Sequence, residues 1–452
     1  MIKRFKITKL FGFRTVNIPF DGDIKILIGE NGLGKTTVLN CLYYVLSENY
    51  NKLYSIEFER LDLTFKDGNK IQFTKRELET YLGFRDRQVH RNIPVDILNQ
   101  LDLQEIEEYL SEYESNREKE LGLMRFLSKN RIPRWAPSHI MARELKLLIN
   151  EPTLKKFFQF GELLNSYAID ILYFPTYRRV EEDLKNLGKF IDNSESSGFE
   201  DSYIDDLETF EVKDDTLIHF GMEDVDLRIE NVLDSINYST VEGFSKVTGE
   251  ILSQLLKGFP EIEQEQIDSL DISTAKIVLH RVGDSLSDND RKEILKLLEK
   301  PKGLLKKKEL TYFLFNLIEI YNQHKHLDDA IKKFRDVCNK YLEDKEFRYN
   351  ESAVKIAVYR KGTDDDVKLN KLSSGEKQII SLFSKIYLEF SKNYVVLFDE
   401  PELSLSIEWQ KQLLPDIVSS EKCKFLISVT HSPFIFKNEL DEFAVGMNSY
   451  IK

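Results

Sequence analysis

The chain has 452 residues, of which 41 % are hydrophobic and 31 % charged, a composition that suits a soluble protein of two or three domains. Its 64 basic and 77 acidic residues give a net charge of −13, which argues against a surface that coats nucleic acid as a whole, because such binding depends on Lys and Arg. Cys41, Cys338 and Cys423 show no metal-ligand spacing, and their odd number argues against a disulfide framework. With no signal peptide and no apolar run near the roughly 20 residues that span a bilayer, we expect a cytoplasmic protein without membrane contact.

The first 84 residues have the pattern of the N-terminal part of an α/β nucleotide-binding domain. A Gly-rich loop follows the third of the predicted strands, and a helix is predicted over 36–46. The last two strands are predicted to form a hairpin, because Asp-Gly and Gly-Asn pairs in the turn 66–69 favour tight turns. The predicted strands are 2–10, 16–20, 24–28, 56–65 and 70–75.

Residues 85–345 are predicted to form a mainly helical insertion, because Leu and Ile recur there at three- and four-residue intervals among many charges. Two features interrupt the helical pattern. Residues 171–174 are predicted to form a short apolar strand, and residues 192–215, rich in Ser, Asp and Glu, a mobile acidic loop. Without a sustained heptad pattern, a long coiled coil is not expected.

The strand pattern returns in residues 346–452. The sequence therefore predicts an α/β ATPase head that is split into 1–84 and 346–452 by the insertion. The predicted C-terminal elements are strands at 353–359, 395–400 and 425–429 and helices at 375–390 and 407–417.

The loop from Gly29 to Thr36 fits the pattern G-x-x-x-x-G-K-[ST] and lies between an apolar strand and a helix, the context in which that pattern binds phosphate. Glycines let backbone N–H groups close around the phosphates, and the helix N-terminus adds a favourable dipole. Lys35 is expected to reach the β- and γ-phosphates of ATP, and the hydroxyl of Thr36 to bind Mg²⁺. The predicted nucleotide-binding residues of this loop are Gly29, Asn31, Gly32, Gly34, Lys35, Thr36 and Thr37.

Asp399 and Glu400 end an apolar strand and have separate predicted roles. Asp399 is expected to hold the magnesium ion, and Glu400 to act as the general base that polarises the attacking water. The alternative is an acidic pair that caps the next helix, an alternative that the presence of the Gly29 loop makes less attractive.

The run Leu372–Gln378 places a hydroxyl and flexible backbone at the start of a helix, which is a second anion site. Because one chain has one Gly29 loop, Ser373 and Gly375 are predicted to bind nucleotide held by another subunit. The same letters, Ser-Ser-Gly-Glu, also fit a capping box, and both interpretations can hold together.

His431 follows the last predicted buried strand, where an imidazole can bond the γ-phosphate and sense its loss. Arg178 and Arg179 follow a short apolar strand and are either phosphate ligands or members of a structural ion pair. Gln72 is a weaker candidate for contact with magnesium and water. The basic runs 131–134 and 306–308 are candidates for DNA contact, although a solvated surface explains them more simply.

Together these motifs resemble the ABC-type ATPases of the SMC, RecF and OLD class. The sequences of 399–402 and 430–433 look most like the OLD-like branch. The segments 173–179 and 221–225 look like the stand-alone ATPase subunits of the PARIS and Septu anti-phage systems. Where that family commonly has His, this chain has Ser406. The resemblance implies an ABC-type P-loop ATPase head that forms a head-to-tail ATP-sandwich dimer and a higher oligomer, a hexamer being expected.

In such a dimer, Lys35, Thr36, Asp399, Glu400 and His431 of one chain meet Ser373 and Gly375 of the other. The resemblance also implies a separate nuclease or toxin effector, with a phage protein as a candidate trigger. About twenty residues follow His431, so we expect no C-terminal nuclease domain and no nuclease activity in this chain.

Two functions follow as hypotheses. The leading one is an ATP-binding and hydrolysing scaffold or sensor subunit of an anti-phage defence complex that controls a separate effector. The alternative is a DNA-binding ATPase of DNA repair, similar to RecF and SMC proteins. A transporter's nucleotide-binding subunit is disfavoured, because such subunits are compact and lack an insertion of this size.

Overall fold

The computed structural model describes most of the chain, and its described residues fall into two compact units. The first unit comprises 1–217 and 392–452, and the second comprises 218–391. These boundaries differ from the predicted ones at 84 and 345. The described ranges are 1–30, 32–84, 116–129, 151–175, 222–261, 270–283, 286–299, 304, 307–389 and 393–452.

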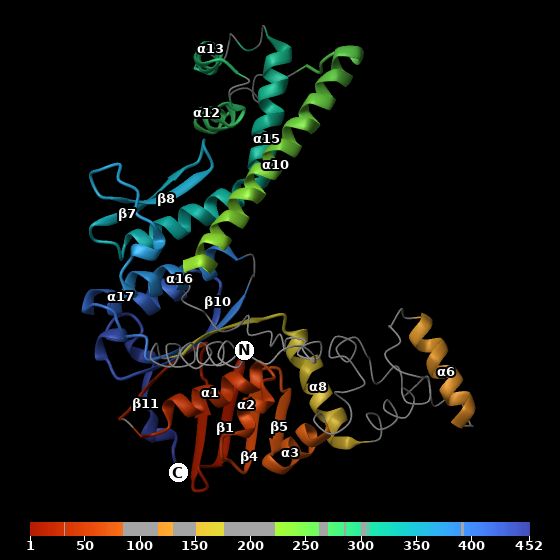
Figure 1. The fold of residues 1–452 in the computed structure, drawn as a ribbon, viewed down its shortest axis with the longest axis vertical. Helices are drawn as coiled ribbons and strands as arrows, with labels where there is room; N and C mark the ends of the chain where they lie inside the picture. The colour runs from red at the N-terminus through yellow and green to blue at the C-terminus, as the bar shows by residue number, and fades with distance from the viewer. Residues whose placement is uncertain are drawn as a thin grey trace, which may run out of the picture. The chain divides into compact units, whose positions relative to one another are not determined.

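The first unit contains a four-stranded antiparallel sheet in the order β2-β1-β4-β5 (Figure 1). Its strands alternate buried and exposed residues, as expected of a sheet with one face on the core. The predicted hairpin is confirmed as β4 and β5, joined at the turn that the Asp-Gly pair favours. The strands are β1 (Ile2–Leu10), β2 (Arg14–Pro19), β4 (Arg60–Phe65) and β5 (Lys70–Thr74).

A five-stranded parallel sheet of order β11-β3-β10-β9-β6 forms the other layer of the first unit. The central strands β9 and β10 are almost entirely buried, which explains their unbroken apolar sequence. Its strands are β3 (Ile24–Ile28), β6 (Asp170–Phe174), β9 (Tyr394–Asp399), β10 (Cys423–Thr430) and β11 (Ala444–Gly446).

One continuous apolar core joins the two sheets and α1. The predicted helices after the Gly-rich loop and after β9 are confirmed as α1 and α17, and both predicted strands at 395–400 and 425–429 are confirmed. The described helices of this unit are α1 (Lys35–Leu46), α2 (Tyr50–Tyr54), α3 (Lys75–Phe84), α6 (Asn116–Lys129), α8 (Pro152–Ser166) and α17 (Ile407–Val418), with the short 3-10 helices η4 (Pro433–Ile435), η5 (Asp441–Phe443) and η6 (Met447–Tyr450).

The strand β6 lies within the predicted insertion, yet it pairs in parallel with β9 along its whole length. The sequence indicated a strand there but not its place in the sheet, because strand pairing across more than two hundred residues leaves no local signal. Residues 85–174 therefore include a structural part of the first unit.

The second unit is built on two long helices, α10 (Met222–Lys257) and α15 (Lys308–Asn339), which pack along each other (Figure 1). Gly243 permits this close approach, since an added Cβ would lie 2.4 Å from Cγ2 of Ile320. Buried positions of α10 recur every three or four residues, but Ser239 and Gly243 occupy two of them. These small residues hide the repeat from a count of apolar residues, which is why the paired long helices were not predicted.

The remaining elements of the second unit lie around this helix pair. Helix α16 packs on both long helices, and the predicted helix at 375–390 is thereby confirmed. The hairpin of β7 and β8 includes a strand at 345–350 that was not predicted. Those that the structure describes are α12 (Ile272–Arg281), α13 (Asp288–Leu298), β7 (Lys345–Asn350), β8 (Lys355–Arg360), η3 (Leu369–Lys371) and α16 (Ser374–Leu388).

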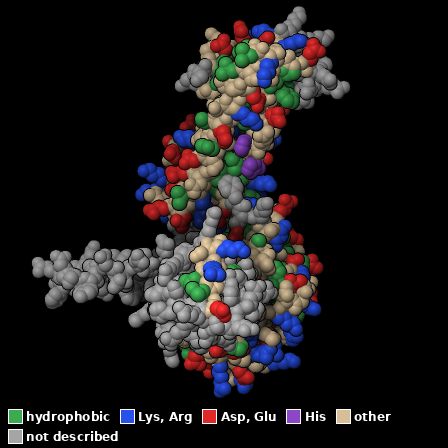
Figure 2. Space-filling view, turned by 90° about the vertical axis from the view of Figure 1, so that its right-hand side faces the viewer, with side chains coloured by type: hydrophobic (Ala, Val, Ile, Leu, Met, Phe, Trp, Pro, Cys, Tyr) green, Lys and Arg blue, Asp and Glu red, His purple; other side chains and the backbone are tan. Residues whose placement is uncertain are grey.

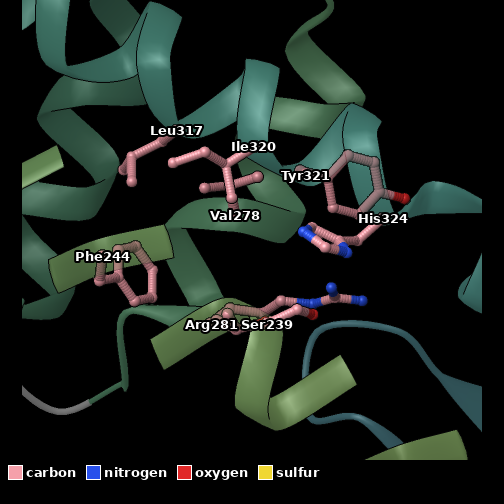
Figure 3. A pocket seen from close by; sticks show the side chains of 9 residues that line it. Ser239, Phe244, Val278, Arg281, Leu317, Ile320, Tyr321 and His324 are labelled. Carbon is pink, nitrogen blue, oxygen red and sulfur yellow. The ribbon is translucent and has the colours of Figure 1, made fainter. Parts of the chain in front are cut away.

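A small pocket lies where α10, α12 and α15 meet, and the side chains of Arg281, Tyr321 and His324 gather at one end of it (Figure 3). Arg281 donates from Nη2 to Oδ1 of Asp328 at 2.6 Å and from Nε to the carbonyl of Glu351 at 3.0 Å. These contacts join α12, α15 and the β7–β8 turn. No helix of the described residues is both long and apolar enough to span a bilayer.

Candidate active site

The Gly-rich loop runs from the end of β3 into α1, as predicted. Gly32 and Gly34 have φ angles of 84° and 80°, which a residue with a Cβ adopts only with strain. Gly34 is also the N-cap of α1, so its backbone sets the direction of the first helical turn. The first turn, Lys-Thr-Thr-Val, carries no carboxylate and includes Thr37, which leaves the positive end of the helix dipole open to an anion.

Lys35 is buried and its ammonium group is held inside the loop. Nζ donates to the carbonyls of Gly29 at 2.7 Å and Glu30 at 2.9 Å, and lies 2.8 Å from Nε2 of His431. Since an ammonium group only donates, Nε2 accepts and His431 carries its proton on Nδ1. Burial lowers the pKa of Lys35, against the opposing attraction of Glu400, Asp399 and Glu402.

Thr36 and Asp399, the two predicted magnesium ligands, are brought together by the fold. Oγ1 of Thr36 donates to Oδ1 of Asp399 at 3.0 Å, although the residues are 363 positions apart. Asp399 is buried at the end of β9, and β9 is placed beside α1 by the central sheet. A hydroxyl and a carboxylate are oxygen ligands of the type that Mg²⁺ prefers.

Glu400 follows directly and has a φ of 51°, unusual for a residue with a side chain. Its N–H donates to the carbonyl of Val429 at 2.8 Å, which fixes this conformation against β10. Oε1 lies 3.9 Å from Nε2 of His431. The strained backbone therefore aims a half-buried carboxylate at the same place as Lys35 and His431.

Glu402 is a site residue that the sequence analysis did not single out. Its Oε1 accepts from the backbone N–H groups of His431 at 2.7 Å and Ser432 at 3.1 Å, and its Oε2 accepts from Oγ1 of Thr430 at 2.8 Å. One carboxylate thus holds the last residue of β10 and the two residues that follow it. Its acidic neighbours at 399 and 400 were the available signal, but its bonding partners lie about thirty positions away.

Gln410 on α17 also links the segment that follows β9 to the segment that follows β10. Its Nε2 donates to the carbonyl of Leu405 at 3.0 Å, and its Oε1 accepts from Oγ of Ser432 at 2.6 Å. The segments after β9 and β10 are therefore tied to each other by side chains as well as by the pairing of the two strands. Ser406, the departure from the family pattern, is the N-cap of α17 and accepts from the N–H of Trp409.

Ser373 and Gly375 belong to the second unit and are described with it. Ser373 caps α16 in a capping box with Glu376, which confirms that interpretation of the run. The N–H and Oγ of Ser373 donate to Oε2 of Glu376 at 2.8 and 2.9 Å, and Nζ of Lys345 lies 3.0 Å from Oε1 of Glu376. The Glu376 charge at the helix start is thus balanced by Lys345.

Other predicted residues stand apart from this group. Gln72 lies on β5, where its Oε1 accepts from Nη2 of Arg60 at 3.0 Å. The predictions for Asn31, Arg178, Arg179, the basic run 131–134 and the acidic loop 192–215 fall outside the described residues.

Comparisons with solved structures find head domains of Smc proteins. One, from Pyrococcus furiosus with an extended coiled coil and bound to the C-terminal domain of ScpA, is 13 % identical, with a TM-score of 0.35 and coverage of 97 % of this chain and 91 % of that chain. Another, with a coiled coil and joint from Pyrococcus yayanosii, is 16 % identical, with a TM-score of 0.31 and coverage of 97 % and 93 %. Likenesses at these scores carry no functional argument.

No curated protein matches the sequence. The family described as AAA ATPase domain matches residues 1–436, nearly the whole chain and all of the residues that converge on Lys35. The chain therefore belongs to the AAA ATPase domain family.

Proposed function

We propose that this ATPase hydrolyses ATP at the place where Lys35, Thr36, Asp399, Glu400 and His431 meet. The observation that carries the proposal is the convergence itself. Two hydrogen-bonded contacts, Thr36 to Asp399 and Lys35 to His431, join the Gly-rich loop to the ends of two different strands. Together the five side chains supply a cation, two oxygen ligands, a base and an imidazole in one place.

The residues fit a magnesium nucleotide. Gly32 and Gly34 leave the loop without the side chains that would crowd phosphate, and Lys35 already points its ammonium group into the loop. Thr36 and Asp399 supply oxygen ligands for Mg²⁺, which neutralises phosphate charge when bound.

The residues then divide the reaction among them. Lys35 and His431 bind the terminal phosphate oxygens. For this, the imidazole gives up its contact with Lys35 and carries a proton on Nε2, because a phosphate oxygen can only accept a hydrogen bond. Glu400 accepts a proton from the water whose oxygen attacks the γ-phosphorus, while the bond from phosphorus to the ADP oxygen breaks. The products are ADP and inorganic phosphate. Glu402 keeps His431 in position by holding its backbone.

We also propose that the site is of the ABC type and is completed by a second copy of the chain. Ser373 is exposed at the start of the 15-residue helix α16, where backbone N–H groups favour an anion. The pairing of Glu376 with Lys345 reduces the repulsion that this carboxylate would exert on phosphate. Ser373 and Gly375 of one copy then contact the γ-phosphate bound by the other, head to tail, and a hexamer built from such pairs is the assembly we favour.

Glu400→Gln tests the catalytic assignment. The amide keeps the size of the side chain but cannot accept the proton, so we expect turnover to fall by about a hundredfold or more while ATP still binds. The measurement is phosphate release beside ATP retained after rapid gel filtration. Glu408→Gln, an exposed carboxylate on α17, serves as the matched control. Turnover of Glu400→Gln at the wild-type rate would place the base elsewhere.

We propose further that the ATPase is the scaffold or sensor subunit of an anti-phage complex and controls a separate nuclease or toxin. The support is the resemblance of the segments 173–179 and 221–225 to the stand-alone ATPase subunits of defence systems. The test is mild-salt affinity purification of Glu400→Gln from the native host, followed by mass spectrometry. A stoichiometric nuclease or toxin supports the proposal, and recovery of the ATPase alone contradicts it.

One observation favours the second candidate, an ATPase that binds DNA in repair. A groove on the open face of the antiparallel sheet is lined by four cations, Arg4, Lys6, Arg60 and Lys70, against one carboxylate, Asp62. Such a groove suits a phosphate backbone.

Lys6→Ala with Lys70→Ala is expected to weaken duplex DNA binding and to flatten its salt dependence. Lys66→Ala, whose ammonium pairs with Asp23, is the control. If the double substitution leaves the DNA affinity unchanged, the groove is not a DNA-binding site.

A further inference from the structure

The long helix α10 carries a second apolar stripe. Tyr238, Val241, Leu252 and Leu255 are 72, 68, 60 and 62 % exposed. At about 3.6 residues per turn they lie on one side of the helix, roughly opposite the buried positions that pack against α15. Figure 2 shows hydrophobic side chains, coloured green, exposed among charged ones on one face of the molecule. Apolar side chains gathered in this way mark an interaction surface.

The spacing of the stripe is that of a helix-pairing seam. Positions 238, 241, 245, 248, 252 and 255 are separated alternately by three and four residues, the repeat with which one helix packs on another. The two middle positions hold Ser245 and Thr248, which are small and exposed. None of the six positions carries a charge, so a like helix meets no repulsion along the seam.

The six positions of the seam show the same order of residue types in both chain directions. From either direction it has two large apolar residues, two small polar residues and two large apolar residues. An antiparallel copy centred between Ser245 and Thr248 sets Tyr238 opposite Leu255 and Val241 opposite Leu252. The small central residues, with Gly249 beside them, let the two backbones approach most closely at the centre. Such self-complementarity is what a two-fold interface between identical chains requires.

We propose that two copies of the chain associate through this stripe, with their α10 helices antiparallel about a two-fold axis between Ser245 and Thr248. The association uses no nucleotide and does not depend on the proposed ATP site. A chain with this two-fold interface and a second one at the ATP site can build closed assemblies larger than a dimer. The stripe is short, so we expect an association that depends visibly on protein concentration.

The first experiment is sedimentation velocity without nucleotide over a concentration series. Leu252→Glu with Leu255→Glu is expected to weaken self-association by about tenfold or more, because charges replace apolar contacts in the seam. Lys246→Glu introduces the same side chain on α10 outside the six positions and is expected to leave association unchanged. Circular dichroism and thermal unfolding check that the double variant is folded.

Three results would overturn the proposal. Wild-type protein that stays monomeric without nucleotide would mean that a different protein covers the stripe. Association that survives the double substitution would place the interface elsewhere. A double variant that unfolds at a lower temperature than Lys246→Glu and still associates would mean that the stripe packs within its own chain.

Cross-linking tests the antiparallel register. Ser245→Cys and Thr248→Cys proteins, tagged differently, are mixed and mildly oxidised; wild-type protein controls for Cys41, Cys338 and Cys423. A disulfide needs Cα atoms within about 7 Å, so the proposed register favours bonds between the unlike variants. Bonds formed mainly between like variants would show a parallel pair and contradict the proposal.

Discussion

Lys35 is a buried cation whose hydrogen bonds are all made with the site itself. Two loop carbonyls and the imidazole of His431 surround its ammonium group, and burial lowers its pKa. A lowered pKa means that the folded protein disfavours the charged form relative to the unfolded chain, so this charge costs stability below that pKa. A phosphate bound beside Lys35 would offset that cost, which suits a residue kept for binding.

Lys35→Ala is therefore expected to abolish nucleotide binding without unfolding the protein. The loss of charge-assisted bonds to phosphate, about 1.5–3 kcal/mol each, predicts ATP affinity at least a hundredfold weaker. Isothermal titration with ATP and magnesium measures the affinity, and thermal unfolding without nucleotide measures the stability. Lys9→Ala, which removes an exposed cation paired with Glu59, is the control. Retained affinity would refute the role given to Lys35.

Glu402 acts on the reaction through His431. Glu402→Leu removes both acceptor oxygens from the three donors at the end of β10, so His431 loses its fixed position while the Gly-rich loop keeps its own contacts. We expect the turnover rate to fall by about tenfold and the dissociation constant of ATP to change little. Steady-state kinetics beside equilibrium binding separates the two. Equal losses in both quantities, or a loss matched by unfolding, would show a structural role only.

At the scale of elements, local patterns predicted what local forces determine. The apolar run of β9, the glycines before α1 and the Asp-Gly turn of the β4–β5 hairpin each specify their own backbone, and each was correctly predicted. Contacts between distant elements could not be predicted in this way. The pairing of β6 with β9 and the bonds of Glu402 to the β10 end are long-range. The strand β7 was missed for a different reason: its sequence, Lys-Glu-Phe-Arg-Tyr-Asn, is largely charged and polar, although only four residues separate it from its partner β8.

Arg281 illustrates a long-range contact on which elements depend. Its side chain and that of Asp328 are 6 % and 1 % exposed, and the pair joins α12 to α15. Tyr349 donates to the same carboxylate, and burial together with that bond raises the pKa of Tyr349. The unit thus contains a buried charge that requires its partner.

Arg281→Met is expected to lower the free energy of unfolding by about 3–5 kcal/mol, because Asp328 is left buried without a cation. Lys332→Met removes a half-exposed cation from Glu351 and is expected to cost about 1 kcal/mol or less. Denaturant unfolding of both variants measures the difference. Equal effects of the two substitutions would mean that the Arg281 pair does not support the unit.

For the whole molecule, motif order carried more information than composition. The Gly-rich loop, the Ser373 run, the acidic strand end and His431 occur in the order of an ATPase head, and the fold brings the first, third and fourth together within one unit. Ser373 and Gly375 lie in the other unit. Because one chain has one Gly29 loop and a second predicted anion site, we propose that a second copy supplies the remaining contact with nucleotide.

Activity on mixing two inactive variants tests this claim most directly. Lys35→Ala removes the loop contact, and Ser373→Arg blocks the exposed helix start; each protein alone is expected to be inactive. When the two proteins are mixed in equal amounts and pair at random, half of the dimers contain one copy of each variant. Each mixed dimer has one complete site out of two, which predicts about a quarter of the wild-type turnover. A mixture no more active than its two components, or full activity of Ser373→Arg alone, would contradict a site shared between two copies.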